Sequence, residues 1–369
     1  MRPHRSLSLR VAIVGLIAVL SACAPADPDQ QEESSPTSAT IDDIVTELDG
    51  LDGQEREEML LEMVKGEGSE LSLYTSLSSE VEEELADAFG DAYDIDVSVF
   101  RADSETMLQR LREESRADFT GADVVETTGF EMVLLDNDGI LAHYESPSLE
   151  LLSGDAQQGS WTTDRFNNFV VSWNTSDVSP AERPRSWEDL ADPRWEGRLA
   201  MEPSDIPWFK ALWEYWEDEG RSSEEIQDLF EGMAENSLFI KGHTTTGTLL
   251  TAGEVSVAAS NYSYLVETEV AKGAPVAWKP IVEPVISLPF GVAPVRSAPH
   301  PATALLFVDW LLSDGQEVLL DLRLDPARED LSTTADVEER VVDLTSLVDE
   351  QEEWTQRYEE LTRLGEVQN

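Results

Sequence analysis

The stretch LSLYTSLSSEVEEELADAFGDAYDIDVSVF, residues 71–100, combines the two periodicities of an α/β fold. Leu71–Thr75 predicts a buried strand, and residues 95–99, in which apolar side chains alternate, predict a second one. Between them, Ser79–Gly90 predicts a helix, because its apolar residues recur on one face. The stretch therefore predicts a strand–helix–strand unit.

The same pattern continues along the chain. Ser79 and Glu82 match a capping box at the start of the first helix, and Ser104 is placed to cap a second helix. Ala122–Glu126 predicts a third strand. Alternation at this spacing predicts an α/β fold whose parallel sheet has helices on both faces. Ligands of such sheets bind at the carboxyl ends of the strands, near helix N-termini.

The second half of the chain repeats this alternation. Strands are predicted at residues 198–202 and 253–259, and the chain returns through residues 282–295 to a buried helix. Helices are predicted at Pro207–Gly220, Ser223–Asn236, Tyr262–Ala271 and Pro301–Leu312, and residues 336–364 are acidic and helix-prone.

Cys23 is the only cysteine, and it stands where a bacterial lipoprotein carries its lipid. Basic residues near the start precede the ten-residue apolar run Val11–Leu20, which ends in Leu20-Ser21-Ala22-Cys23. Spanning a membrane takes about 20 apolar residues, so this run predicts a signal peptide instead. We expect Cys23 to be lipidated, with palmitate or similar chains, on the extracytoplasmic face of the cell membrane. The Pro-, Ser- and acid-rich segment that follows predicts a disordered tether.

The composition is strongly acidic. The formal net charge is −51, with 76 Asp and Glu against 25 Lys and Arg, so nucleic acid is not expected as a partner. Salt-tolerant organisms use such surfaces, and the sequence leaves open whether this one reflects halophily. No GxSxG, HExxH or P-loop motif is present, and we expect neither enzymatic activity nor a cofactor.

Four segments occur in a characteristic order. The most specific is Pro184–Arg198, PRSWEDLADPRWEGR, and the others are Leu73–Ser76, Ala252–Ala258 and Ala298–Gln316. Together they resemble family 1 extracellular solute-binding proteins of ABC transporters, and the ferric-iron-binding branch in particular. The resemblance implies a two-lobed, type II periplasmic-binding-protein-like fold with hinge strands and a ligand cleft between the lobes.

The sequence divides into five segments. Its own patterns give residues 1–22 as the signal peptide, 23–40 as the lipidated tether, 41–67 as a helical segment and 336–369 as an acidic helix. The resemblance covers 68–335 and implies the two-lobed domain, with its second lobe at about 175–280. It also implies that the protein, expected to be a monomer, captures a small solute, namely iron or an iron complex. The protein would then deliver the solute to a permease and ATPase.

The ligand residues of the iron-binding branch are only partly matched. That branch binds iron with two adjacent Tyr after an Asn, and here Asn261-Tyr262-Ser263-Tyr264 keeps the first Tyr only. Tyr262 is therefore the one candidate metal ligand, because a helix starting at Tyr262 would turn Tyr264 to another face. The family's His and Glu positions fall near Ser78 and near Thr127 or Thr128.

Further candidates come from the chain itself. Ser76 and Ser78 precede the first helix, where they would cap it, contact the ligand, or both. Asp205 and Pro207 disfavour a phosphate at the second-lobe turn. His243 either starts a helix capped by Thr244 or contacts the ligand with Asp205 and Tyr262.

The predicted ligand-binding set is Ser76, Ser78, Thr127, Thr128, Asp205, His243, Thr244, Asn261 and Tyr262. Trp208 is expected in the core, with the cleft wall as the alternative. The ligand itself is left open between iron and an organic solute such as a sugar phosphate, a polyamine or a thiamine-like molecule. A sensor lipoprotein that has lost transport is a further alternative.

Overall fold

The computed structural model describes residues 39–51, 53–119, 121–153 and 156–368. Cys23, the signal peptide and nearly all of the tether lie outside these residues, so those predictions stay predictions. No helix in the described part of the chain has the length and apolarity needed to cross a membrane.

The first lobe is built on three parallel strands, as predicted. These are β1 (Glu70–Thr75), β2 (Asp96–Arg101) and β3 (Val124–Thr128), in the spatial order β2-β1-β3. Helices α3 (Ser79–Tyr93) and α4 (Ser104–Arg116) connect them.

Both predicted helix caps are displaced by one residue. Ser78 occupies the N-cap of α3 without a side-chain capping bond, so the capping box at Ser79 and Glu82 is wrong. Asp103, not Ser104, caps α4, because its carboxylate accepts a 3.0 Å bond from the Thr106 amide.

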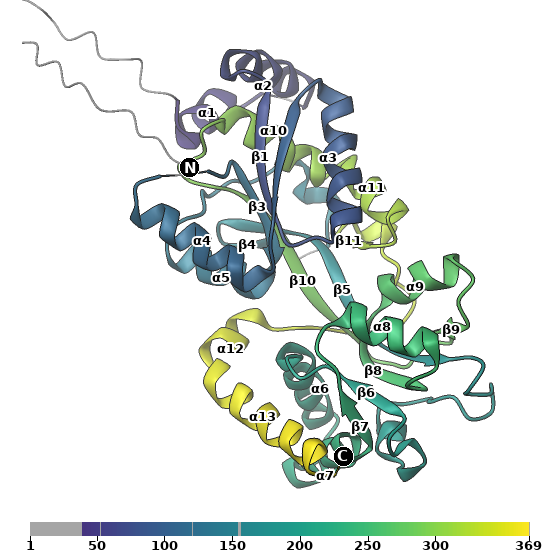
Figure 1. Cartoon of the computed structure of the whole chain (residues 1–369). Coiled ribbons are helices and arrows are strands. Elements are labelled where there is room, and N and C mark those ends of the chain that lie inside the picture. The colour runs from purple at the N-terminus through teal and green to yellow at the C-terminus, as the bar shows by residue number, and fades with distance from the viewer. Residues whose placement is uncertain (1–38, 52, 120, 154–155, 369) are drawn as a thin grey trace, which may run out of the picture. The chain divides into compact units, whose positions relative to one another are not determined.

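Two long antiparallel strands, β5 (Trp161–Asn174) and β10 (Val285–Pro294), continue the sheet between the two halves of the molecule (Figure 1). One part of β10 pairs with β3 of the first lobe, and the far end of β5 pairs with β8 of the second. Sequence patterns did not reveal β5, because it is buried along nearly its whole length and so lacks polar alternation.

The second lobe contains three parallel strands in the order β8-β6-β7. They are β8 (Val257–Tyr262), β6 (Leu199–Met201) and β7 (Ser237–Phe239). Its helices are α6 (Ile206–Asp218), α7 (Ser223–Asn236), α8 (His243–Ala252) and α9 (Ser263–Ala271). The strand predicted from residue 253 starts later, because Gly253 ends α8 with a left-handed φ of 77°.

An apolar cluster rich in aromatic side chains fills the space between α6, α7 and the C-terminal helix. Trp208, Phe209 and Phe230 pack there in edge-to-face and tilted contacts, and all three are fully buried. The expectation that Trp208 belongs to the core is confirmed.

The N-terminal segment packs on the first lobe, whereas the C-terminal segment contacts both lobes. Helices α1 (Ile41–Leu48) and α2 (Gly53–Glu67) lie against α10 (Pro301–Leu311) in the first lobe, near α11 (Gly315–Asp321). The C-terminal region is not one helix. It forms β12 (Glu339–Val341), α12 (Leu344–Asp349) and α13 (Gln351–Gln368). It does so because β12 pairs with β10 and Asp343 caps α12. Helix α12 lies against α5 (Gly129–Asn137), and α13 lies against α6 and α7.

The remaining elements are short or lie at the edges of the sheet. They are α5 (Gly129–Asn137), β4 (Gln157–Gln158), β9 (Val276–Ala277), β11 (Asp325–Pro326) and the 3-10 helices Pro147–Leu151, Glu188–Ala191, Pro193–Trp195 and Glu329–Leu331.

Candidate functional site

Two adjoining cavities open between the lobes, and both are lined by Thr128 and Tyr262. The wide cavity, about 650 Å³, is lined by α4 and α5 of the first lobe, by the α6 and α8 N-termini of the second, and by Leu347 and Gln351 of the C-terminal segment. The narrow cavity, about 220 Å³, lies where β1, β2 and β3 end. This is the strand edge at which the sequence predicts ligand binding.

Four helices begin at the narrow cavity. The N-caps of α3, α4, α5 and α9 are Ser78, Asp103, Thr128 and Tyr262. Of these, only Asp103 caps its helix with its own side chain. Because helix N-termini present free amide groups and a partial positive charge, their convergence favours an anionic or oxygen-rich ligand.

Tyr262 and Tyr264 lie side by side at this cavity. Their ring centroids are 6.0 Å apart and their planes differ by 19°. The expectation that Tyr264 faces elsewhere is wrong, because Tyr262 ends β8 in an extended conformation and α9 begins only at Ser263. Two phenol groups are therefore available, although the two Tyr are not adjacent in sequence.

Both phenols are hard to ionise without a cation. Burial raises the pKa of Tyr262 well above its usual value, and the negative charge of Asp205 raises it further. Burial also raises the pKa of Tyr264, although the positive charges of Arg165 and Arg101 oppose this change.

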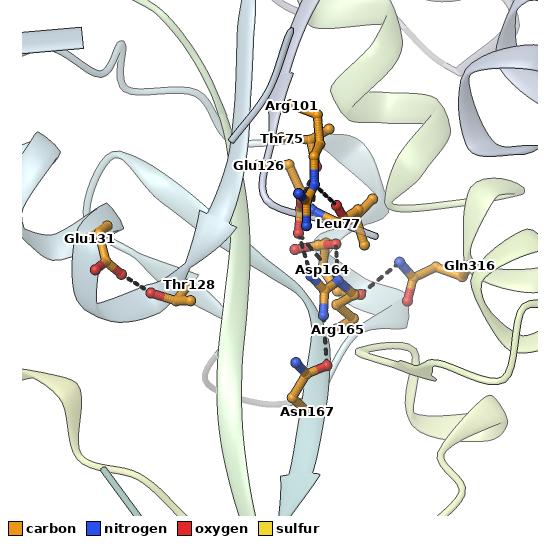
Figure 2. Close-up of polar contacts among 10 residues, drawn as sticks. All are labelled: Thr75, Leu77, Arg101, Glu126, Thr128, Glu131, Asp164, Arg165, Asn167 and Gln316. Carbon is orange, nitrogen blue, oxygen red and sulfur yellow. Dashed lines mark hydrogen bonds and ion pairs between the residues drawn. The ribbon is translucent and has the colours of Figure 1, made fainter. Parts of the chain in front are cut away.

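Arg101 supplies a positive charge beside the two tyrosines. It ends β2, and its Nε donates a 2.9 Å bond to the carbonyl of Leu77 (Figure 2). In the part of the chain that the structure describes, Arg101 has no carboxylate within ion-pair distance. Its guanidinium lines the cavity and is held there by the bond to Leu77.

Arg165 forms the floor of the narrow cavity within a buried polar network (Figure 2). It donates 2.8 Å bonds to the Glu126 carboxylate and to Asn167 Oδ1, and Thr75 donates to Glu126 from the other side. Asp164 Oδ2 lies 3.9 Å from Arg165 Nε, and neither carboxylate oxygen of Asp164 has a hydrogen-bond partner among the described residues. Burial, followed by the charge of Glu126, raises the pKa of Asp164 to about 8.

Asp205 and His243 meet in the wide cavity. His243 Nε2 lies 3.1 Å from Asp205 Oδ1, and the imidazole centroid is 3.9 Å from that of Tyr262. Burial by itself lowers the pKa of His243, but the charge of Asp205 and its hydrogen bond raise it above the usual value. The three predicted site residues Asp205, His243 and Tyr262 are thus brought together.

The other predicted site residues divide between the cavities and their surroundings. Ser76, Ser78 and Thr128 line the narrow cavity, and the buried Ser76 hydroxyl has no partner among the described residues. Thr127 and Asn261 are buried and line neither cavity.

Thr244 is exposed and does not cap α8. Gly242 does so instead, with a φ of 92° that favours glycine.

Sequence reasoning missed Arg101, Tyr264 and Glu202. Arg101 carried a usable signal, because it ends a predicted parallel strand at the ligand-binding edge. Predicting the position of Tyr264 would have required starting helix α9 one residue later, at Ser263. The sequence determines the ends of a helix less well than its existence.

The cavities lack a conventional metal cluster. Over the described residues, no group of three or more His, Cys, Asp or Glu side chains is placed to hold a metal ion. A hard cation here would depend on phenol oxygens and on ligands that it brings with it.

Comparison with known proteins relates the chain to one family. Residues 132–314 match the family described as bacterial extracellular solute-binding protein, so this part of the chain is similar to that family. Iron uptake protein A1 of Synechocystis sp. is 23% identical over 283 residues, covering 69% of this chain and 74% of that protein.

Solved structures of binding proteins share the fold. Iron-bound HitA from Pseudomonas aeruginosa matches with a TM-score of 0.67 and 22% identity, over 79% of this chain and 99% of HitA. AfuA from Actinobacillus pleuropneumoniae, bound to fructose-6-phosphate, matches with a TM-score of 0.63 and 21% identity, over 80% and 99%. The predicted two-lobed, type II periplasmic-binding-protein fold is confirmed.

Proposed function

We propose that this solute-binding protein captures ferric iron, together with a chelating oxygen ligand, and delivers it to the permease and ATPase of an ABC importer. The observation that carries the proposal is the Tyr262–Tyr264 pair in the interlobe cleft. Ferric iron is a hard cation that prefers anionic oxygen, and two phenolates would supply it. The relatives named for iron uptake support the same ligand class.

The remaining coordination positions would be filled by the chelator. By the resemblance, Ser78 lies near the His position of the iron-binding branch, and Thr127 or Thr128 lies near its Glu position. None of these residues carries a charge that would replace the missing His or Glu. Arg101 and the four helix N-termini would hold the chelator's oxygen atoms.

Capture would work by closing the lobes. The lobes are joined through β5 and β10, so bending of these strands would bring Tyr262 toward the strand ends of the first lobe. A ligand that contacts both lobes binds the closed state better and shifts the population toward it. No chemical turnover is required.

Iron binding would release protons. The pKa of both phenols is raised, so each must lose its proton as the metal binds, and affinity should fall as pH falls.

The experiment is titration of the purified protein with ferric citrate and ferric nitrilotriacetate, with metal analysis after gel filtration. We expect about one iron atom per chain, and less as the pH is lowered below 7. Iron that elutes entirely apart from the protein in both cases would rule out this function.

A second candidate, an organic phosphate, is favoured by Arg101 and the converging helix N-termini. AfuA was solved with fructose-6-phosphate. Under this alternative, fructose-6-phosphate would raise the melting temperature and the ferric complexes would not.

The membrane anchor is part of the same proposal. Lipid on Cys23 would hold a monomer near its permease. Cells fed labelled palmitate should label the wild-type protein. A Cys23→Ser variant should lose the label and be released from the membrane fraction, and continued membrane retention would contradict the anchor.

A further inference from the structure

The second-lobe wall of the wide cavity carries two buried carboxylates with different partners. Glu202 is 6% exposed and accepts bonds from the backbone amides of Ser204 and Gly242, but burial, followed by the charge of Asp205, raises its pKa. Asp205 is 4% exposed, and only its Oδ1 is paired, with His243. Its Oδ2 has no partner among the described residues.

The charges around Asp205 do not balance. Even when His243 is protonated, two carboxylates face one cation on this wall. On the opposite wall, Glu105 and Glu131 line the same cavity. Arg112 is also there, but its Nε is already paired with Asp138 at 2.6 Å. A buried charge is costly unless it is paired with an opposite charge. The wide cavity therefore favours a ligand that carries a positively charged group.

Aromatic rings complete the lining. Phe130, Phe169 and Tyr262 border the cavity, and the Phe169 and Tyr262 rings pack with centroids 5.0 Å apart. Ring faces attract ammonium and guanidinium groups. Since the described carboxylates and His243 do not form a metal cluster, the chemistry favours an organic cation.

We propose that Asp205 accepts an ammonium or guanidinium group of the ligand, in a subsite of the wide cavity that adjoins the Tyr262–Tyr264 pair. The ligand class is then an iron chelate with a positively charged substituent. This inference rests on the proposed function, and it assigns a positively charged group to the chelator that accompanies the iron. The wide cavity has room for such a substituent, since it is larger than the narrow one.

Long-range electrostatics favours the same class. The formal net charge of −51 attracts cations and repels anionic chelates as they approach the cleft.

The test compares two ferric complexes of nearly equal shape. Glycine hydroxamate carries an ammonium group where acetohydroxamate carries only hydrogen, and both leave iron positions open for phenolates. We expect the wild-type protein to bind the ferric glycine hydroxamate complex at least tenfold more tightly in 150 mM salt. Acetylation of the glycine hydroxamate amine removes its positive charge and should abolish this preference. This control requires no protein variant.

Variants then locate the subsite. Asp205→Asn should bind the two complexes equally, whereas Asp91→Asn, which removes an exposed carboxylate on α3, should keep the preference. Circular dichroism checks that both variants fold. If the wild-type protein binds the two complexes equally, the cation subsite is wrong but iron capture is not contradicted. The same holds if Asp205→Asn still prefers the glycine hydroxamate complex. Binding of neither complex contradicts iron capture itself.

Discussion

Replacing Asp164 by Asn should make the protein more stable at pH 7.5 and give no such gain at pH 5. Asp164 lies in β5 at the irregularity where pairing with β10 shifts between Phe290 and Gly291. It is fully buried, and Arg165, its nearest cation, is already bonded to Glu126. The carboxyl therefore retains its proton near neutral pH, with a pKa of about 8.

The magnitude follows from proton linkage. From about pH 4, where an unfolded Asp ionises, to about pH 8, the folded state binds this proton more tightly than the unfolded state. Stability therefore falls as pH rises through this window, by about 1.4 kcal/mol per pH unit. Asn is neutral and of similar size, so it removes this slope. The advantage of Asp164→Asn over wild type should grow by about 3 kcal/mol between pH 5 and pH 7.5.

Urea denaturation at pH 5, 6, 7 and 7.5 measures this difference. Asp228→Asn, at an exposed position on α7, is the matched control and should follow the wild-type curve. A stability difference between Asp164→Asn and wild type that does not change with pH would refute the reasoning. So would a loss of stability at pH 7.5, which would mean that Asp164 is ionised and stabilises Arg165.

Three further outcomes are expected. Asp309→Ala removes the ion-pair partner of the half-buried Arg56 and should lower the free energy of unfolding, measured in urea, by about 2–4 kcal/mol. The control Asp321→Ala, at an exposed site, should change this free energy little. Lys210→Met breaks the bonds from α6 to Ser346 of α12 and to Glu350, which precedes α13. Hydrogen exchange in α12 and at the start of α13 should become faster while β1–β3 stay protected, and unchanged exchange would contradict this anchoring role. Arg101→Gln should weaken binding of the ferric complex about tenfold in equilibrium titration. The melting temperature should not change, because Arg101 is exposed and has no ion pair in the described chain. Unchanged affinity would exclude Arg101 from the site.

The regular parts of the fold were predictable because their side chains repeat with a clear period. The strands and helices of residues 70–128 alternate apolar and polar residues, since one face of each helix meets the sheet and the other meets water. The strand β5 was not predictable in this way. Both of its faces are buried, and Trp161–Asn174 carries polar residues inside the protein, such as Arg165, which bonds to Glu126 and Asn167.

The candidate site was predicted in part for a related reason. Tyr262, Asp205 and His243 were found from their residue types and their places in the chain, and the structure brings them together. Tyr264 was missed because a single residue of extended backbone at Tyr262 changes which side chains lie next to each other. Asn261 was expected at the ligand but is buried beside the site, with its Oδ1 accepting a bond from the Tyr262 amide.

The most direct measurement of the central claim is the visible absorption spectrum of the protein loaded with ferric iron. If Tyr262 and Tyr264 both bind the metal as phenolates, a charge-transfer band should appear on loading. Tyr262→Phe and Tyr264→Phe should each shift and weaken this band, and the double variant should lose it. A loaded protein without such a band, or a band unchanged in both single variants, would show that these tyrosines do not hold iron.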